Sequence, residues 1–431
     1  MKQKPNQKSG QQSRPFKPKA HSPRELPICE LHPISIQQIK NGHPWVTKDR
    51  YSMAFPQQAD LIGGQSKNRQ FVATLINDPK HPHIKARLWD TRKSFIKARQ
   101  DFMSDLSTRI DWAISKRKEL GLLKERENFY LVFGESDYIP GLHALKFGNI
   151  IIVQYYAYCW ARYEKKITEF LTKAYKKHFP DQELLQIRFQ QRNHKQELKE
   201  NVFQLSTKDT PRPTLVEFGV RYQTLLNERY DIGLYTDAAS IRKKIAPFIQ
   251  DQSKVLNLYA YTGAFSLLAL KKGATEVHSV DLSQKVMKWL EKNIQLNEFD
   301  KNQKHVSHQS TVSDALDKFI REGQTFSQII IDPPPSFFDG KKKETALESY
   351  QKDLPKMMQI LEPHGHILAL LNTQKVSREK FIDKINNILD KHDEEEAFEI
   401  IDQWGLEEDC KPLNGFPEGD YLKALLIHRQ W

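Results

Sequence analysis

The sequence predicts an α/β protein of several domains, the last of which is built on a doubly wound sheet. From residue 214 onward, apolar strands alternate with helices, and turn residues follow the strand ends. Residues 28–95 instead carry short apolar stretches between close turns, which is typical of a compact β-barrel. Residues 96–205 mix helical and strand patterns and indicate a small α/β domain. A length of 431 residues is consistent with several domains.

The expected elements follow from the spacing of apolar residues. In the middle part, this spacing predicts helices over 95–121 and 158–175, and strands at 129–133 and 149–154, joined through 136–148. In the last part, the expected strands are 255–259, 276–281, 328–332 and 365–371, and the expected helices are 265–270, 285–296, 312–320, 347–361 and 378–389.

Residues 1–27 are rich in proline, glutamine and basic residues and hold almost nothing apolar except Phe16. Because little here offsets the entropy cost of ordering, we expect a disordered basic tail. A solubilising tail and an RNA-contacting arm both remain open as its role. The sequence therefore predicts four parts, namely 1–27, 28–95, 96–205 and 206–431.

The net charge of +12 is unevenly distributed along the chain. Residues 1–205 carry a net +16, whereas residues 206–431 carry a net −4. This division predicts that the N-terminal half handles a polyanionic partner and that the C-terminal half does different work.

Several classes of protein are excluded by composition. The three cysteines, Cys29, Cys159 and Cys410, are scattered without a CxxC pair, which rules out a disulfide scaffold and a multi-cysteine zinc module. No zinc-type or Ser-His-Asp spacing stands out among the fifteen histidines, so we expect no metal. The longest apolar run, over 150–161, is too short to span a bilayer, and because no apolar stretch follows the basic start we expect no secretory signal. We therefore expect a soluble cytoplasmic protein with no membrane partner.

Ligands of an open α/β sheet bind beyond the carboxyl ends of its strands. The first such end, 256–265, contains a turn at Gly263 but no GxGxxG, which disfavours a dinucleotide site and a nicotinamide dehydrogenase. Asp281 ends the next strand and could accept hydrogen bonds from both hydroxyls of a ribose. Asp314, within 313–315, could bind an adenine amino group. Alternatively, Asp281 and Asp314 cap the helices that follow them.

The fourth strand end reads Asp332-Pro333-Pro334-Pro335. Three prolines fix the backbone and remove three donors, so Asp332 should face the pocket as an acceptor. Phe337 or Phe338 could then stack on a planar base. The lysines at 341–343 could meet a phosphate backbone or be solvated.

At these residues the sequence resembles the PUA-domain-containing ribosomal RNA methyltransferases, the group typified by the 23S rRNA cytosine-5 enzyme. The resemblance covers most of residues 33–431. It rests on Gly-His-Pro-Trp at 42–45, the 256–265 loop, Asp281-Leu282-Ser283, Asn293 to Asn297, Asp332-Pro333-Pro334 and the terminal 417–423 segment.

This resemblance implies a Rossmann-like class I methyltransferase domain preceded by a PUA-like β-barrel, with S-adenosylmethionine as cofactor and RNA as partner. It assigns the ribose to Asp281, the adenine to Asp314 and the target base to the Asp332 turn. The implied cofactor-binding residues are Asp237, Arg242, Asn257, Tyr259, Thr262, Gly263, Asp281, Leu282, Ser283, Asp314 and Ala315. The implied catalytic residues are Asp332, Pro333, Pro334, Phe337 and Asn372.

The sequence departs from the family pattern by an extra proline in the Asp-Pro-Pro turn, by Ala239 in place of an arginine and by Asn372 in place of a cysteine. Methylation at cytosine carbon 5 needs a covalent nucleophile at the adjacent ring carbon. Cys410 is interpreted as a bystander, whereas Asn372 resembles the residue that guanine-modifying relatives carry at this strand end. The main hypothesis is therefore an RNA methyltransferase acting on a base of ribosomal (23S) RNA, as a monomer or homodimer, with a purine nitrogen slightly favoured over cytosine carbon 5. The alternative is an RNA-binding ribosome-assembly factor with an inactive methyltransferase fold.

Overall fold

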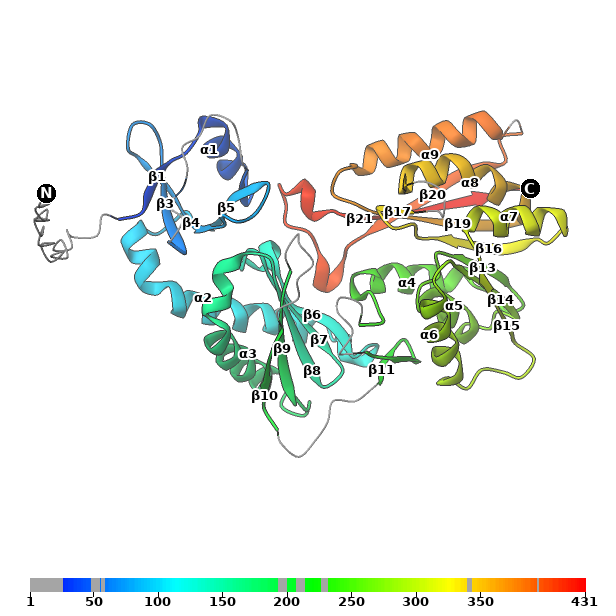
Figure 1. Ribbon diagram of the computed structural model, residues 1–431, viewed down its shortest axis with the longest axis horizontal. Coiled ribbons are helices and arrows are strands. Elements are labelled where there is room, and N and C mark those ends of the chain that lie inside the picture. Colours follow the sequence, from blue (N-terminus) through cyan, green and yellow to red (C-terminus); the bar gives the residue numbers. More distant parts are fainter. Residues whose placement is uncertain are drawn as a thin grey trace, which may run out of the picture.

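The computed structural model describes residues 26–47, 55, 59–192, 200–206, 214–225, 232–338, 343–393 and 395–431. Within these ranges the strands form two five-stranded sheets, one seven-stranded sheet and two hairpins (Figure 1). The predicted basic tail, apart from Leu26 and Pro27, lies outside the described residues, as do Lys341 and Lys342. None of the described helices is long and apolar enough to cross a membrane.

The first sheet has the strand order β1-β3-β4-β5-β2. Its strands are β1 (Ile28–Glu30), β2 (Trp45–Thr47), β3 (Leu61–Gln65), β4 (Phe71–Asn77) and β5 (Ile84–Asp90). The helix α1 (Pro33–Lys40) was not predicted. His32 is its N-cap, and the ring nitrogen of His32 accepts a hydrogen bond from the backbone of Ile34. The helix buries only Ser35 and Ile39. With only two buried positions, the sequence of this helix shows no apolar repeat at helical spacing from which it could be predicted.

The middle sheet has the order β10-β9-β8-β7-β6, and two helices pack on it. Its elements are α2 (Phe95–Glu119), β6 (Asn128–Phe133), β7 (Leu142–Phe147), β8 (Ile150–Tyr155), α3 (Glu164–His178), β9 (Gln186–Gln191) and β10 (Glu200–Gln204). The prediction was incomplete here, because the expected connection through 136–148 contains β7, and β9 and β10 were missed. The helix expected over 158–175 is also wrong in detail. A 3-10 turn, Tyr158–Arg162, precedes α3, because the backbone of Tyr163 at φ −110° and ψ 5° interrupts the helix.

The seven-stranded sheet has the order β15-β14-β13-β16-β19-β21-β20. Its strands are β13 (Lys254–Leu258), β14 (Glu276–Asp281), β15 (Lys304–Gln309), β16 (Phe326–Ile331), β19 (Leu361–Asn372), β20 (Phe398–Gly405) and β21 (Leu422–Arg429). The first five strands in this order are parallel, and β21 runs antiparallel to both of its neighbours. The predicted doubly wound sheet is confirmed, although β15 and β20 were missed.

Helices cover both faces of this sheet (Figure 1). The helices α4 (Ala239–Ile245), α5 (Ala264–Lys271) and α6 (Gln284–Gln295) lie on one face, and α7 (Val312–Arg321), α8 (Ala346–Ile360) and α9 (Arg378–His392) lie on the other. Because successive side chains along a strand point to opposite faces of the sheet, each strand contributes to the apolar core on both faces. Ile329 and Ile331 pack with α7, α8 and α9, whereas Ile330 packs with α4 and α5.

Buried ion pairs connect the middle sheet to the last part of the chain. Arg126, just before β6, contacts Asp409 of the 3-10 turn η6 (Glu408–Cys410) at 2.6 Å and Glu408 at 2.9 Å. Asp409 also accepts a 2.6 Å hydrogen bond from the backbone of Tyr130. Both Arg126 and Asp409 are buried, so their charges are compensated almost entirely by each other and by these bonds.

The Gly-His-Pro-Trp segment at 42–45, which leads into β2 of the first sheet, contacts residues 416–418 near the end of the chain. His43 bonds to Glu418 at 3.1 Å, and the rings of Trp45 and Phe416 lie 4.6 Å apart. The Trp45 indole also donates a 2.7 Å hydrogen bond to Glu135 of the middle part. Trp45 therefore acts as a packing residue at the junction of all three parts.

Candidate functional site

A cavity of about 770 Å³ lies beyond the carboxyl ends of the five parallel strands. The strand order reverses between β13 and β16, and such a reversal is where open α/β sheets bind ligands. The predicted site residues that line this cavity are Asp237, Arg242, Tyr259, Asp281, Leu282, Ser283, Asp314, Asp332, Pro333, Pro334 and Asn372.

The loop after β13 alternates between ordinary and left-handed backbone. Tyr259, Tyr261 and Gly263 have φ angles of 55°, 48° and 88°. Left-handed geometry is strained for a bulky residue, and such strain gathers at ligand sites. Gly263 is required for a second reason, because a Cβ atom there would come within 2.8 Å of Leu267 and Leu290. The loop thus turns sharply past the cavity and into α5.

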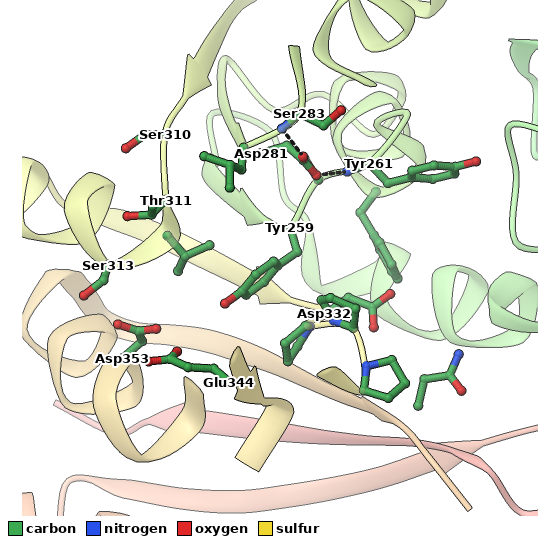
Figure 2. A pocket seen from close by; sticks show the side chains of 18 of the residues that line it. Tyr259, Tyr261, Asp281, Ser283, Ser310, Thr311, Ser313, Asp332, Glu344 and Asp353 are labelled. Carbon is green, nitrogen blue, oxygen red and sulfur yellow. Dashed lines mark hydrogen bonds between the residues drawn. The ribbon is translucent and has the colours of Figure 1, made fainter. Parts of the chain in front are cut away.

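Asp281 is held by this loop. Its carboxylate accepts hydrogen bonds from the backbone of Tyr261 at 3.1 Å and of Ser283 at 2.9 Å (Figure 2). Burial raises the pKa of Asp281, and these backbone donors oppose the rise. Ser283, not Asp281, caps α6, since the Ser283 hydroxyl accepts from the backbone of Val286. The two carboxylate oxygens keep acceptor capacity, which fits a pair of ribose hydroxyls.

Asp314 lies in the first turn of α7, where Thr311 is the cap. The Thr311 hydroxyl accepts from the Asp314 backbone at 3.2 Å and donates to the Asp314 carboxylate at 2.7 Å. Asp314 therefore takes part in the helix cap and also lines the cavity.

Asp332 follows β16 and lines the cavity together with the prolines after it. Burial, and secondly the nearby carboxylate of Asp237, raise the pKa of Asp332 to about 7, although the Arg242 guanidinium opposes the rise. Among the described residues, none donates a hydrogen bond to this carboxylate. Asp332 is therefore poised to meet a ligand donor, and its protonation state changes near neutral pH.

Asp237 and Arg242 are each fixed by another part of the chain. Asp237 lies on the 3-10 turn η4 (Thr236–Ala238), and the hydroxyl of Tyr421 donates to it at 2.8 Å. The guanidinium of Arg242 binds Glu217 at 2.6 Å and 3.0 Å. Because both members of the Arg242–Glu217 pair are buried, Arg242 supports the cavity wall with a charge that is already paired.

Four predicted cofactor-binding residues do not line the cavity. Asn257 donates to the Ser266 hydroxyl at 2.8 Å, and Thr262 donates to the carbonyl of Gly233 at 2.6 Å. Gly263 and Ala315 pack against the helices behind the loop and in the core. The structure thus gives these residues contacts behind the wall of the cavity.

Of the other two predicted catalytic residues, Asn372 lines the cavity, whereas the structure does not describe the side chain of Phe337. Asn372 ends β19 and lines the cavity beside Leu422, its partner on β21. Phe337 lies in the short strand β17 (Ser336–Phe338), which pairs with β18 (Lys343–Thr345), but its side chain is outside the described part. Cys29, Cys159 and Cys410 are buried, and none of them lines this cavity. Burial raises the pKa of the Cys410 thiol well above its usual range.

Sequence reasoning missed three notable residues of the cavity. Tyr235 is exposed, and its ring lies 5.1 Å from that of Tyr261. Asp353 on α8 is buried, accepts from the Ser349 hydroxyl at 3.3 Å, and has a pKa raised by burial. Lys356, one turn later, donates to the Ser313 hydroxyl at 2.8 Å. The carboxylate of Asp353 on the buried face of the predicted helix was a signal that could have found this residue.

The site has the features of an enzyme whose cofactor contains a nucleoside but not the pyrophosphate of a dinucleotide. Acidic residues follow β14, β15 and β16, and the loop after β13 has the sharp turn but not the glycine cluster of a dinucleotide site. Residues 176–391, half of the chain, match the S-adenosylmethionine-dependent methyltransferase family. The chain belongs to this family, and it is an S-adenosylmethionine-dependent methyltransferase.

Two relatives align over nearly the whole chain. The ribosomal RNA large subunit methyltransferase I of Pseudoalteromonas translucida (strain TAC 125) is 26% identical over 406 residues, which is 90% of this chain and 96% of the relative. The protein of the same name from Erwinia tasmaniensis is 28% identical over 398 residues, again 90% and 96%. Their similarity therefore extends well beyond the catalytic domain.

A solved structure has the same fold over almost the same length. SMU.776, complexed with SAH, superposes with a TM-score of 0.78 at 19% identity, covering 94% of this chain and all of that one. The arrangement of all three sheets is thus shared with a protein of known structure.

Proposed function

We propose that this methyltransferase modifies a base of large-subunit (23S) ribosomal RNA. The observation that carries the proposal is the alignment of about nine-tenths of the chain with relatives named ribosomal RNA large subunit methyltransferase I. The charge distribution supports it, because the non-catalytic half carries the excess of positive charge that a phosphate backbone attracts. The same argument makes RNA the partner of this chain.

In this proposal, Asp281 binds the two ribose hydroxyls of the cofactor and Asp314 binds its adenine. S-adenosylmethionine supplies an activated methyl group on a positively charged sulfur. The carboxylate of Asp237 favours that positive charge at its end of the cavity. The remaining task of the chain is to align the acceptor atom with the methyl group and to exclude water, which Asp332, Pro333 and Pro334 accomplish at the target base.

We propose a purine nitrogen, rather than cytosine carbon 5, as the methylated atom. The proposal rests on Asn372, which lines the cavity where a cytosine-5 enzyme needs a thiol, and on the three buried cysteines outside the lining. Incubation with rRNA containing 5-fluorocytidine tests it. We expect no stable protein–RNA adduct, whereas an adduct that disappears in Cys410→Ala would show that the carbon is attacked.

The N-terminal parts would hold the RNA. We propose that residues 28–95 form a PUA-like domain, that residues 96–205 form the middle domain and that residues 1–27 are a basic arm. In support, the first sheet is built mainly of antiparallel strands, and its contacts to Glu418 and Phe416 attach it to the catalytic part.

Mass spectrometry of rRNA nucleosides from cells with and without the gene tests the function directly. We expect one methylated nucleoside to disappear from the large-subunit RNA of the deletion strain and to return when the purified protein and S-adenosylmethionine are added. Identical nucleoside profiles in the two strains, together with no methyl transfer to the deletion-strain rRNA, would refute the proposal.

A further inference from the structure

The cavity has two chemically different ends. Asp281 and Asp314 come from the ends of β14 and β15 on one side of β13, whereas Asp332, Asn372 and Leu422 come from β16, β19 and β21 on the other side. Asn372 and Leu422 pair in the sheet, Tyr421 bonds to Asp237, and Asp237 raises the pKa of Asp332. If ribose and adenine occupy the first end, the acceptor base must enter at the second. The inference that follows rests on the proposed function.

A cluster of aromatic rings from the middle domain lies next to the turn η4, whose Asp237 lines the cavity. This aromatic cluster consists of Tyr130 and Phe133 on β6, His143 on β7 and Tyr156, which follows β8. The His143 ring lies 4.9 Å from Phe133, 5.7 Å from Tyr130 and 5.5 Å from Tyr156. The four rings therefore form one packed cluster, joined through His143 by edge-to-face contacts.

Two observations direct this cluster toward Asp237 and the cavity. The turn η4, which carries Asp237, packs directly against β6. The negative charge of Asp237 also contributes to raising the pKa of both Tyr130 and Tyr156. The aromatic cluster, and Tyr156 with it, is therefore a neighbour of the turn η4 and of Asp237, which lines the cavity.

Tyr156 differs from the other members of the cluster in its exposure. Its side chain is 43% exposed, whereas Phe133 is 5% exposed and Tyr130 and His143 are half-buried. One ring thus offers a free surface, and the other three support it. A base that has left its stack needs such a surface, because stacking on an aromatic side chain replaces the stacking it has lost.

We propose that Tyr156 is the stacking platform for the target base, so that the middle domain and the catalytic domain together form the base-binding site. The base lies against the Tyr156 ring, and its edge faces Asp332 and Asn372. The middle domain is then part of the substrate site, and neither domain alone would bind the extruded base.

Tyr158 provides a matched control. It is also exposed, at 41%, and lies two residues further along the chain, but the Lys80 ammonium covers its ring at 3.7 Å from the centroid. The test compares Tyr156→Leu, Tyr156→Phe and Tyr158→Leu with the unchanged protein. The substrate is rRNA from cells that lack the gene, and the measured quantities are kcat, KM for RNA, and the Kd for S-adenosylmethionine.

We expect Tyr156→Leu to lower kcat/KM for this rRNA by about tenfold or more, mainly through a higher KM. The Tyr156→Phe and Tyr158→Leu variants should stay within about twofold, because the first keeps the ring and the second lies outside the site. The Kd for S-adenosylmethionine and the melting temperature should be unchanged in all three.

Three results would overturn this assignment. Normal kinetics of Tyr156→Leu would remove the stacking role but leave the proposed function intact. An equal loss in Tyr158→Leu, or a parallel loss of cofactor affinity in Tyr156→Leu, would indicate a merely structural effect. Absence of rRNA methylation by the unchanged protein would instead refute the proposed function, and the stacking role with it.

Discussion

The hydroxyl of Tyr421 donates a 2.8 Å hydrogen bond to the carboxylate of Asp237, although 184 residues separate them in the chain. This bond attaches the start of β21 to the turn η4 at the edge of the cavity. It also holds a negative charge near Asp332, whose pKa rises to about 7. The terminal segment therefore contributes to the electrostatics of the site as well as to the sheet.

Replacement of Asp332 by alanine should remove turnover while the cofactor still binds. The carboxylate faces the methyl-accepting end of the cavity, and loss of one such oriented polar group costs about 100-fold or more in kcat. Calorimetry should give a Kd for S-adenosylmethionine within about threefold of the unchanged protein, since no expected cofactor contact depends on Asp332. Normal methylation by this variant would mean that the reacting end of the cavity has been misplaced.

The raised pKa of Asp332 also predicts how stability changes with pH. An acid whose pKa is higher in the folded protein binds more protons there, so its contribution to stability is complete below pH about 4 and is lost as pH rises to about 7. Asp332→Asn cannot ionise and should not suffer this loss. Its melting temperature, relative to the unchanged protein, should rise by a few degrees between pH 4 and 7 and then level off. A difference in melting temperature between the two proteins that does not depend on pH would contradict the assigned pKa.

Asp281→Ala should weaken S-adenosylmethionine binding by about 100-fold, because two hydrogen bonds to a charged acceptor are lost. The variant also frees the backbone donors of Tyr261 and Ser283, so the loop after β13 should loosen. RNA affinity should remain largely intact, since Asp281 lies at the end of the cavity away from the acceptor base. Unchanged cofactor affinity in calorimetry would show that the ribose binds elsewhere.

The order of polar residues along the chain predicted much of this site. Asp281, Asp314 and Asp332 each follow a strand, and parallel strands bring such ends to one edge of the sheet, whatever lies between them. The strand β15 was not predicted, because it lies at the edge of the sheet and its residues are mostly polar and only partly buried. They therefore show no alternation of apolar and polar residues.

Other features depend on geometry that no local pattern encodes. Tyr259 and Tyr261 adopt left-handed backbone that sequence rules reserve for glycine, because the surrounding structure imposes it. Asp237 meets Tyr421, and β6 meets the turn η4, only through the packing of distant elements. The proposed division of the substrate site between two domains therefore could not be predicted from the sequence.

Asp409→Asn should destabilise the protein by about 3–5 kcal/mol, since it leaves the buried Arg126 guanidinium without its closest partner. Urea denaturation followed by circular dichroism would measure this loss. Glu408→Gln is a matched control, because Glu408 pairs with the same arginine but is 25% exposed, and its effect should be less than half as large. Equal effects of the two substitutions would show that burial of the pair is not what matters.

Deletion of residues 1–25 should weaken RNA binding and make it less dependent on salt, while S-adenosylmethionine binding is unaffected. These residues contain seven lysines and arginines, and each contact with a phosphate that is lost lowers the slope of log K against log salt by about 0.7 for single-stranded RNA. Fluorescence anisotropy with a labelled rRNA fragment at several salt concentrations gives this slope. Replacing the same seven residues by glutamine should reproduce the effect at unchanged length. An unaltered slope in both proteins would identify the arm as a solubilising tail, and the positive charge that binds RNA would then have to lie within residues 28–205.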